Sequence, residues 1–222
     1  MALAAFGGLL VLAAFPLYPI GTVEVAGARH VARERAGERA ALRGRPAFWA
    51  DSARARAGLL ELPAVRDARV ELALPDRARI VLVEREAVVR WVVGNLEWFV
   101  DAEGVLFASA DGSAAPALWV DDEREPERAA GERLDPALVD AAVRLAKLAP
   151  GELRADALDP RVRIVAGLDG LIFESGAGWE VRFGGPERFE EKLALARSFL
   201  REEPERRLEY LDVRSADQLV FR

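Results

Sequence analysis

The chain has 222 residues, 51% of them hydrophobic, which is long enough for two small domains with packed cores. Its formal net charge of -6, with acids interleaved among the arginines, argues against a nucleic-acid-binding protein. Because the sequence contains no cysteine, it excludes disulfides, zinc sites built on cysteine and thiol catalysis.

The N-terminal segment is uncharged and apolar. No charged side chain occurs over residues 2–23, which exceeds the roughly 18 residues that indicate a membrane helix. We predict a transmembrane anchor over residues 1–21, with residues 2–20 in the lipid bilayer and Tyr18 at its interface. A cleaved signal peptide is the alternative, and it is disfavoured because no basic region precedes the apolar run.

Residues 22–85 predict a small α+β domain. Residues 22–27 form a β-rich run, and residues 31–42 have a helical apolar pattern. Asp51 is suited to cap a second helix, which Pro63 prevents from continuing.

A β-hairpin completes this domain. Apolar and polar residues alternate over residues 68–74, the sequence Leu74-Pro75-Asp76 turns the chain, and residues 78–84 return as a second strand. The order is therefore strand, helix, helix, strand, strand. The side chains expected in its core are Val65, Val70, Leu74, Ile80 and Leu82.

Residues 86–222 predict a mainly antiparallel β domain with two helices. Apolar runs separated by turn residues at 87–93, 98–101 and 105–108 indicate an antiparallel meander, and a further strand is expected at 117–120.

The two helices of this domain have clear start signals. Asp135-Pro136 places a capping carboxylate before a proline, and the first helix ends at Pro150. The second opens near Glu187 and closes at Pro204. The remaining strands are expected at residues 162–166, 170–174, 179–183, 208–213 and 218–221.

Short motifs occur in order along the chain. They are Pro63-x-Val65-x-x-Ala68-x-Val70, Leu74-Pro75, Glu84-Arg85, Val89-x-Trp91, Val100-Asp101-x-x-Gly104-x-x-Phe107 and Leu208-x-Tyr210-x-Asp212-x-Arg214. The order of elements resembles the POTRA domain, and the motifs together resemble the cell-division protein family FtsQ, also called DivIB. The chain departs from the family at Ala87, where proline is frequent.

The resemblance implies a single N-terminal transmembrane helix, a POTRA domain (βααββ) at residues 22–85 and an FtsQ-type β domain at residues 86–222. It implies a non-catalytic bitopic scaffold of the bacterial divisome, which binds FtsB- and FtsL-type proteins and links early and late division proteins for septal peptidoglycan synthesis. Such a protein lies in the inner (cytoplasmic) membrane at the division septum, with its C-terminal domains outside the cytoplasm.

The orientation of the anchor has two conflicting signals. Four arginines follow the apolar segment within residues 29–39, and the positive-inside rule would place them in the cytoplasm. The resemblance implies the opposite orientation, with a basic cytoplasmic tail before Met1, and we give it precedence.

The last predicted strand is a candidate docking site, because nothing later in the sequence can pair with its outer side and an open edge accepts an added strand. The resemblance implies that an FtsB-type partner docks here and touches the preceding helix. The residues expected to bind it are Lys192, Arg197, Arg214, Ser215, Leu219, Val220 and Phe221. Alternatively, Leu219 and Phe221 face the core and loops cover the edge.

No catalytic, metal or cofactor motif is recognised, so we predict no enzymatic activity. His30 is the only histidine and has no serine nearby in sequence. The acidic run at residues 121–123 lacks the spacing of a calcium loop and is interpreted as a solvated loop. The glycines over residues 167–185 contain no dinucleotide motif. The tryptophans are expected in core or domain-junction packing, rather than on a carbohydrate platform: Trp49, Trp91, Trp98, Trp119 and Trp179.

Two other functions remain as alternatives. A POTRA component of outer-membrane assembly or secretion would carry repeated POTRA units or a run of barrel strands. A membrane-anchored cell-wall hydrolase is disfavoured by the scarcity of histidine and cysteine.

Overall fold

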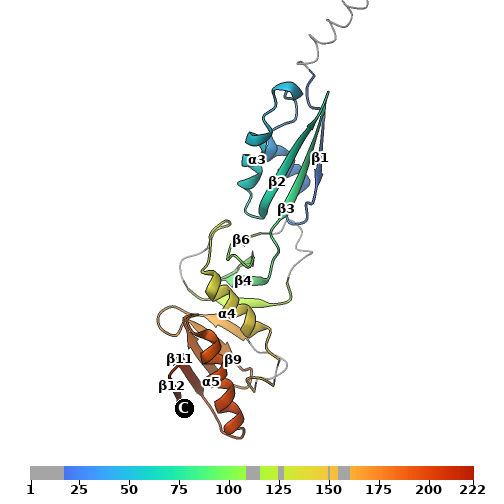
Figure 1. Ribbon diagram of the computed structural model, residues 1–222. Coiled ribbons are helices and arrows are strands. Elements are labelled where there is room, and N and C mark those ends of the chain that lie inside the picture. Colours follow the sequence, from blue (N-terminus) through green and yellow to red (C-terminus); the bar gives the residue numbers. More distant parts are fainter. Residues whose placement is uncertain (1–17, 109–115, 125–127, 150, 155–160) are drawn as a thin grey trace, which may run out of the picture. The chain divides into compact units, whose positions relative to one another are not determined.

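The computed structural model describes residues 18–108, 116–124, 128–149, 151–154 and 161–222 (Figure 1). The chain divides into two compact units, of which the N-terminal unit ends at Arg85 and the C-terminal unit begins at Glu86. Of the transmembrane anchor predicted over residues 1–21, residues 1–17 lie outside the described residues. Among the helices that are described, none is long and apolar enough to cross a membrane.

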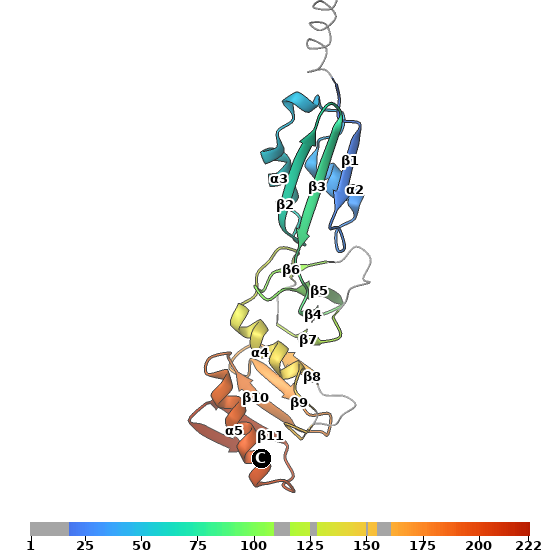
Figure 2. The same cartoon turned by 45° about the vertical axis from the view of Figure 1, so that its right-hand side comes forward.

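The N-terminal unit is a three-stranded sheet with helices on one face (Figure 2). Strand β1 is parallel to β3, which is antiparallel to β2, and the spatial order is β1-β3-β2. The predicted order of strand, helix, helix, strand, strand is confirmed. Its elements are β1 (Thr22–Ala26), α2 (Arg33–Ala40), the 3-10 helix η2 (Ala47–Trp49), α3 (Ser52–Leu60), β2 (Val65–Ala73) and β3 (Arg77–Glu84).

Helix α3 begins where the sequence predicts. The Asp51 carboxylate accepts hydrogen bonds from the backbone amides of Ala53 and Arg54 at 2.9 and 3.0 Å. These bonds satisfy two amides that the first turn leaves unpaired. A Cβ at Gly58 would lie 2.6 Å from the Arg39 carbonyl oxygen, so glycine permits the close approach of α2 and α3.

The motif Glu84-Arg85 holds two distant segments in place. The Glu84 carboxylate accepts hydrogen bonds from three consecutive backbone amides of residues 29–31, at 2.7 to 2.9 Å. The Arg85 guanidinium donates to the carbonyl oxygen of Pro63 at 3.0 Å. His30 is therefore a buried residue of a turn that Glu84 organises.

The core of this unit largely follows the prediction. Val65, Ile80 and Leu82 are buried, and Val70 is half-buried. The prediction for Leu74 is wrong, because β2 ends at residue 73 and Leu74 lies in the turn with an exposed side chain.

Ile20 belongs to the same core. Its side chain is fully buried, and its backbone amide donates to the Arg45 carbonyl oxygen at 2.8 Å. The predicted contact of residue 20 with lipid is therefore wrong, because protein atoms cover this side chain.

The C-terminal unit is built on a nine-stranded sheet of order β12-β11-β10-β9-β8-β7-β4-β5-β6. Five neighbouring pairs are antiparallel and three are parallel, which confirms a mainly antiparallel domain with two helices. Its elements are β4 (Val89–Val93), β5 (Leu96–Val100), β6 (Leu106–Phe107), β7 (Trp119–Asp122), α4 (Pro136–Ala146), β8 (Arg161–Ile164), β9 (Leu171–Glu174), β10 (Glu180–Gly184), α5 (Phe189–Glu202), β11 (Tyr210–Ser215) and β12 (Gln218–Phe221).

The tryptophans divide into two groups. Trp91 and Trp179 are buried in the core of the C-terminal unit, and Trp98 is half-buried against it. Trp49 and Trp119 are exposed, so neither packs in a core, and the domain-junction packing that the sequence left open for them stays a prediction. Both lie in short apolar runs, which do not reveal whether another segment covers the side chain.

The acidic run at residues 121–123 lies at the end of β7, and not in a solvated loop as predicted. The buried Asp122 carboxylate accepts a 2.7 Å hydrogen bond from Nε of Arg124, and Glu123 pairs with Arg163 at 3.0 Å. Burial raises the pKa of Asp122, but hydrogen bonds from Arg124 and Trp91 outweigh this effect and lower the pKa. The run therefore supplies structural ion pairs.

Candidate partner-binding edge

Strand β12 forms one edge of the large sheet (Figure 1). It pairs with β11 alone, with Leu211 opposite Phe221 and Asp212 opposite Val220. The other edge, β6, is covered by its own chain, because Leu106 exchanges backbone hydrogen bonds with residues 131–132 at 2.8 and 2.9 Å. In the described part of the chain, no backbone bond of this kind covers the outer side of β12.

The direction of each β12 amide follows from the ladder. Tyr210 and Arg222 exchange backbone hydrogen bonds at 3.3 and 3.2 Å. Because hydrogen-bonded and non-bonded pairs alternate in an antiparallel ladder, the amide of Val220 points toward β11. The amides of Leu219 and Phe221 therefore point outward, away from β11, where an added strand could bond to them.

The side chains of β12 divide between the two faces of the sheet. Phe221 lies on the face that carries α5, where its ring centroid is 4.9 Å from that of Phe199. The Arg206 guanidinium carbon lies 4.4 Å from the centroid of the same ring. Leu219 packs partly against the core, and Val220 is exposed. The alternative from the sequence therefore holds in part: Leu219 packs against the core, but Phe221 stays exposed beside Phe199, and no described segment pairs with the outer side of β12.

Lys192 does not present its charge to this edge. Its side chain is buried, and Nζ donates to the carbonyl oxygens of Phe183 at 3.0 Å and Gly185 at 2.9 Å. Burial lowers the pKa of Lys192. The expectation that it meets acidic groups of a partner is corrected. Lys192 follows Phe189 by three positions and precedes Ala196 by four, so helical spacing already placed it on the buried face.

Arg197, Arg214 and Ser215 lie apart from the outer side of β12. Arg197 of α5 forms an ion pair with Glu152. Arg214 of β11 donates to the Asp212 carboxylate and, at 2.7 Å, to Asp169. Ser215 is exposed at the end of β11.

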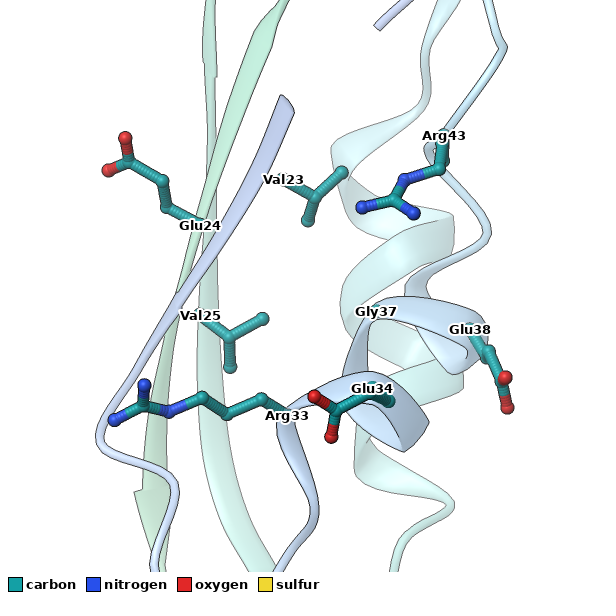
Figure 3. Close-up of a pocket in the computed structure, with 8 residues that line it drawn as sticks. All are labelled: Val23, Glu24, Val25, Arg33, Glu34, Gly37, Glu38 and Arg43. Carbon is teal, nitrogen blue, oxygen red and sulfur yellow. The ribbon is translucent and has the colours of Figure 1, made fainter. Parts of the chain in front are cut away.

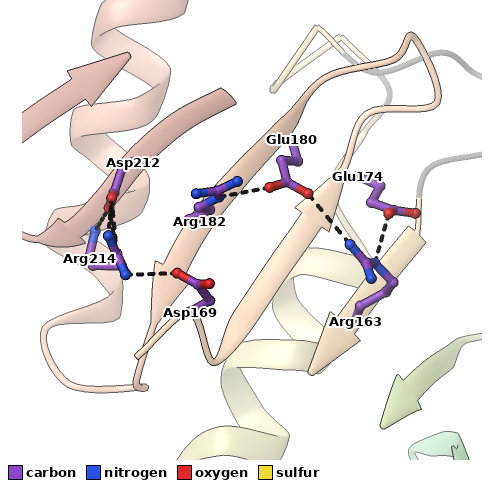
Figure 4. A network of polar contacts seen from close by, with 7 residues as sticks. All are labelled: Arg163, Asp169, Glu174, Glu180, Arg182, Asp212 and Arg214. Atoms are coloured by element: carbon purple, nitrogen blue, oxygen red, sulfur yellow. Dashed lines mark hydrogen bonds and ion pairs between the residues drawn. The ribbon is translucent and has the colours of Figure 1, made fainter. Parts of the chain in front are cut away.

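Arg214 belongs to a layer of charged side chains on one face of the sheet (Figure 4). Val181 and Phe183 of β10 are buried in the core, so the intervening Arg182 points to the opposite face. There Arg163 of β8 pairs with Glu174 of β9 at 2.7 Å and with Glu180 of β10 at 3.5 Å. Arg182 also pairs with Glu180, and Arg214 with Asp212, each within its own strand.

Each arginine of this layer is paired with an acidic side chain of the same chain. Burial raises the pKa of Asp212, but hydrogen bonds from Arg214 outweigh this effect and lower the pKa. Arg214 therefore joins β11 to the turn between β8 and β9, because it pairs with Asp212 of β11 and with Asp169 of that turn.

Two residues of this region, Phe199 and Arg206, are not among the residues predicted to bind a partner. Phe199 follows Leu195 by four positions on α5, and both are half-buried beside the core. That spacing could have identified Phe199. Arg206 lies beyond the end of α5, and only the folded chain brings it onto the ring of Phe221.

The N-terminal unit carries a separate pocket between β1 and α2 (Figure 3). Val23 and Val25 point from β1 toward the helix, while Glu34 and Glu38 contribute carboxylates from α2. The arrangement is a shallow groove beside an edge strand, with no base placed next to a nucleophile.

Both units are similar to known proteins. The N-terminal unit matches the family described as "POTRA domain, FtsQ-type" over residues 18–85. Residues 18–85 are a POTRA domain of the FtsQ type. This domain begins before the predicted start at residue 22, in agreement with the burial of Ile20.

Two curated relatives extend the similarity into the C-terminal unit. The chain is 36% identical over 180 residues to the cell division protein FtsQ of Chloroflexus aurantiacus and, equally, to that of Chloroflexus aggregans. Each match covers 80% of this chain and 65% of the relative, so the chain spans slightly less than two thirds of the relatives' length. The predicted resemblance to FtsQ is confirmed.

Proposed function

We propose that the chain is a non-catalytic scaffold of the bacterial divisome. In this proposal residues 2–17 anchor it in the cytoplasmic membrane, the two units lie outside the cytoplasm at the septum, and FtsB- and FtsL-type proteins bind the C-terminal unit. The FtsQ relatives and the FtsQ-type POTRA domain support a role in division. The proposed docking site is the outer side of β12.

The observation that carries the docking site is the difference between the two edges of the large sheet. The edge at β6 is covered by residues 131–132, whereas β12 leaves the outward amides of Leu219 and Phe221 without a bond inside the described chain. An added strand would bond to these amides, and its side chains would meet Phe199 and Phe221 on the α5 face.

A peptide titration tests this docking mode. We compare Phe221→Pro with Phe221→Ala, using a labelled peptide from an FtsB-type protein and fluorescence anisotropy. Both variants lose the ring, but only proline also removes the outward N–H. We expect weaker binding to Phe221→Ala and a loss of binding to Phe221→Pro, with the circular dichroism of both unchanged.

Proline at the neighbouring position is the matched control. Val220→Pro removes an amide that points toward β11, so it should lower the thermal stability of the C-terminal unit. Equal peptide affinity for Phe221→Pro and Phe221→Ala, with both folded, would reject strand addition at this edge.

Topology is tested independently of docking. Protease treatment of spheroplasts should digest both units while a cytoplasmic control protein survives. Protection of both units under the same conditions would contradict the proposed orientation.

A further inference from the structure

Four large apolar side chains are exposed at one end of the POTRA unit. Tyr18 is 51% exposed, Phe48 57%, Trp49 69% and Leu74 51%. The rings of Phe48 and Trp49 stack edge to face, with centroids 5.2 Å apart. Exposed apolar side chains that gather at one place mark an interaction surface, whereas singly scattered ones are normal on a protein surface.

Backbone hydrogen bonds bring these residues together from three segments. The amide of Ala47, the first residue of η2, donates to the Tyr18 carbonyl oxygen at 3.0 Å, and Pro19 bridges to Pro46. The amide of Gly21 donates to the Asp76 carbonyl oxygen at 2.9 Å, which ties the turn after Leu74 to the same place. Figures 1 and 2 both place η2 and the β2–β3 turn at the end of the unit where residue 18 enters.

We propose that this end of the POTRA unit, which we call the aromatic end (Tyr18, Phe48, Trp49 and Leu74), rests in the interfacial layer of a lipid bilayer. Tyrosine and tryptophan favour that layer because their rings are apolar and their N–H or O–H groups bond to headgroups or water. The inference rests on the proposed membrane anchoring, and it adds a second, protein-borne contact with the same bilayer.

The neighbouring sequence identifies the bilayer as the occupant. Residues 2–17 contain no charged side chain and join directly to Tyr18, so a membrane that holds them begins beside the aromatic end. Arg43, Arg45 and Arg77 are exposed near this end, against the carboxylates of Asp51 and Asp76. The local charge therefore does not repel lipid phosphate groups.

Contact at this end would restrain the POTRA unit. Because the POTRA unit begins only a residue or two after the proposed anchor, it already lies close to the membrane surface. Insertion of Phe48 and Trp49 adds a second point of attachment, so the unit is held in one orientation to the bilayer and cannot swing freely about residue 18.

Trp49 supplies the probe for a direct test. The full chain is reconstituted in lipid nanodiscs at one chain per disc and, in a separate preparation, at two chains per disc. Each preparation is made with ordinary lipid and with lipid brominated on the acyl chains. The emission of Trp49 is obtained as the difference between the unmodified chain and Trp49→Phe. The other exposed tryptophan, Trp119 of the C-terminal unit, is measured in the same way through Trp119→Phe.

We expect brominated lipid to quench the Trp49 emission, and ordinary discs to protect it from acrylamide. The Trp119 emission should stay unquenched by bromine and accessible to acrylamide. Circular dichroism confirms that both variants remain folded.

Three results would overturn the inference. The first is an unquenched Trp49 in chains that co-elute with discs, which leaves the anchoring intact. The second is acrylamide protection only in discs that hold two chains, which would assign the aromatic end to a second copy. The third is failure of the chain to co-elute with discs at all, which removes the anchoring as well. The peptide titration at β12 is independent of each of these outcomes.

Discussion

The indole Nε1 of Trp91 donates a 2.9 Å hydrogen bond to Oδ2 of Asp122, and both side chains are buried. The two residues lie on the neighbouring parallel strands β4 and β7, with Trp91 opposite Val120 in the register. Arg124 completes the cluster from the residue after next. The buried carboxylate thus has hydrogen-bond donors from two residues, the indole of Trp91 and the backbone and guanidinium of Arg124, which is the condition for a charge to remain in a core.

We predict that Asp122→Asn destabilises the protein in a pH-dependent manner. The pKa of Asp122 in the folded chain is lowered, because hydrogen bonds from Arg124 and Trp91 outweigh the effect of burial. At acid pH the unfolded state then binds more protons, so the stabilisation by the carboxylate is present above the unfolded pKa and is lost as the pH falls toward the folded pKa.

Urea unfolding of both proteins between pH 7 and pH 3 measures this effect. The difference in free energy of unfolding should be about 1 to 3 kcal/mol near neutral pH and should shrink below about pH 4. Asp121→Asn, next to it on the same strand, is the comparison: burial raises the pKa of Asp121, so this substitution should not reproduce the loss of stability at neutral pH. If the difference in free energy of unfolding between the two proteins stays constant from pH 7 to pH 3, the charge of Asp122 does not contribute to stability.

A second prediction concerns Gly104, in the turn between β5 and β6. Its φ is +82°, and a Cβ there would lie 2.4 Å from the Leu134 carbonyl oxygen. Gly94 has a φ of +58° with no atom within 4 Å of a Cβ, so it isolates the cost of the left-handed backbone. In thermal unfolding, Gly94→Ala should cost about 1 to 2 kcal/mol, and Gly104→Ala should cost more because the backbone of residue 134 must also move. Equal costs would mean that this close approach is relieved without penalty.

A third prediction tests the core of the POTRA unit. Ile80 on β3 is fully buried, whereas Val83 on the same strand is half exposed. Truncation of Ile80 to alanine should lower the free energy of unfolding by about 2 to 5 kcal/mol, and Val83→Ala should lower it by about 0.5 kcal/mol or less. Urea denaturation monitored by circular dichroism gives both values. Similar costs for the two variants would place Ile80 at the surface.

A fourth prediction separates a structural role of Lys192 from a role in docking. Lys192→Met keeps the length of the side chain but leaves the carbonyl oxygens of Phe183 and Gly185 without their donor. We expect a loss of about 1 to 3 kcal/mol in stability, with unchanged affinity for the FtsB-type peptide. The only other lysine, Lys147, is exposed, and Lys147→Met should change neither quantity. A stable Lys192→Met variant with weaker peptide binding would restore the original expectation for this residue.

Signals that act within a few residues were interpreted correctly from the sequence. Asp51 caps α3 and Asp135 caps α4, each through hydrogen bonds to amides two or three residues later. The strand and helix order of both units follows from periodicity and from turn residues. The motif Glu84-Arg85 is visible in the sequence, but only the fold shows that both side chains form tertiary hydrogen bonds, to residues 29–31 and to Pro63.

What the sequence determined by itself was the identity and the order of the elements, because capping, alternation and turn chemistry depend on neighbouring residues. For other side chains, only the tertiary structure decided what covers them. Leu74 is exposed and Ile20 is covered by protein atoms, although the local pattern placed Leu74 in the core and Ile20 in lipid. Covering a side chain requires atoms from segments remote in sequence, and likewise only the fold shows that no remote segment among the described residues pairs with the outer side of β12.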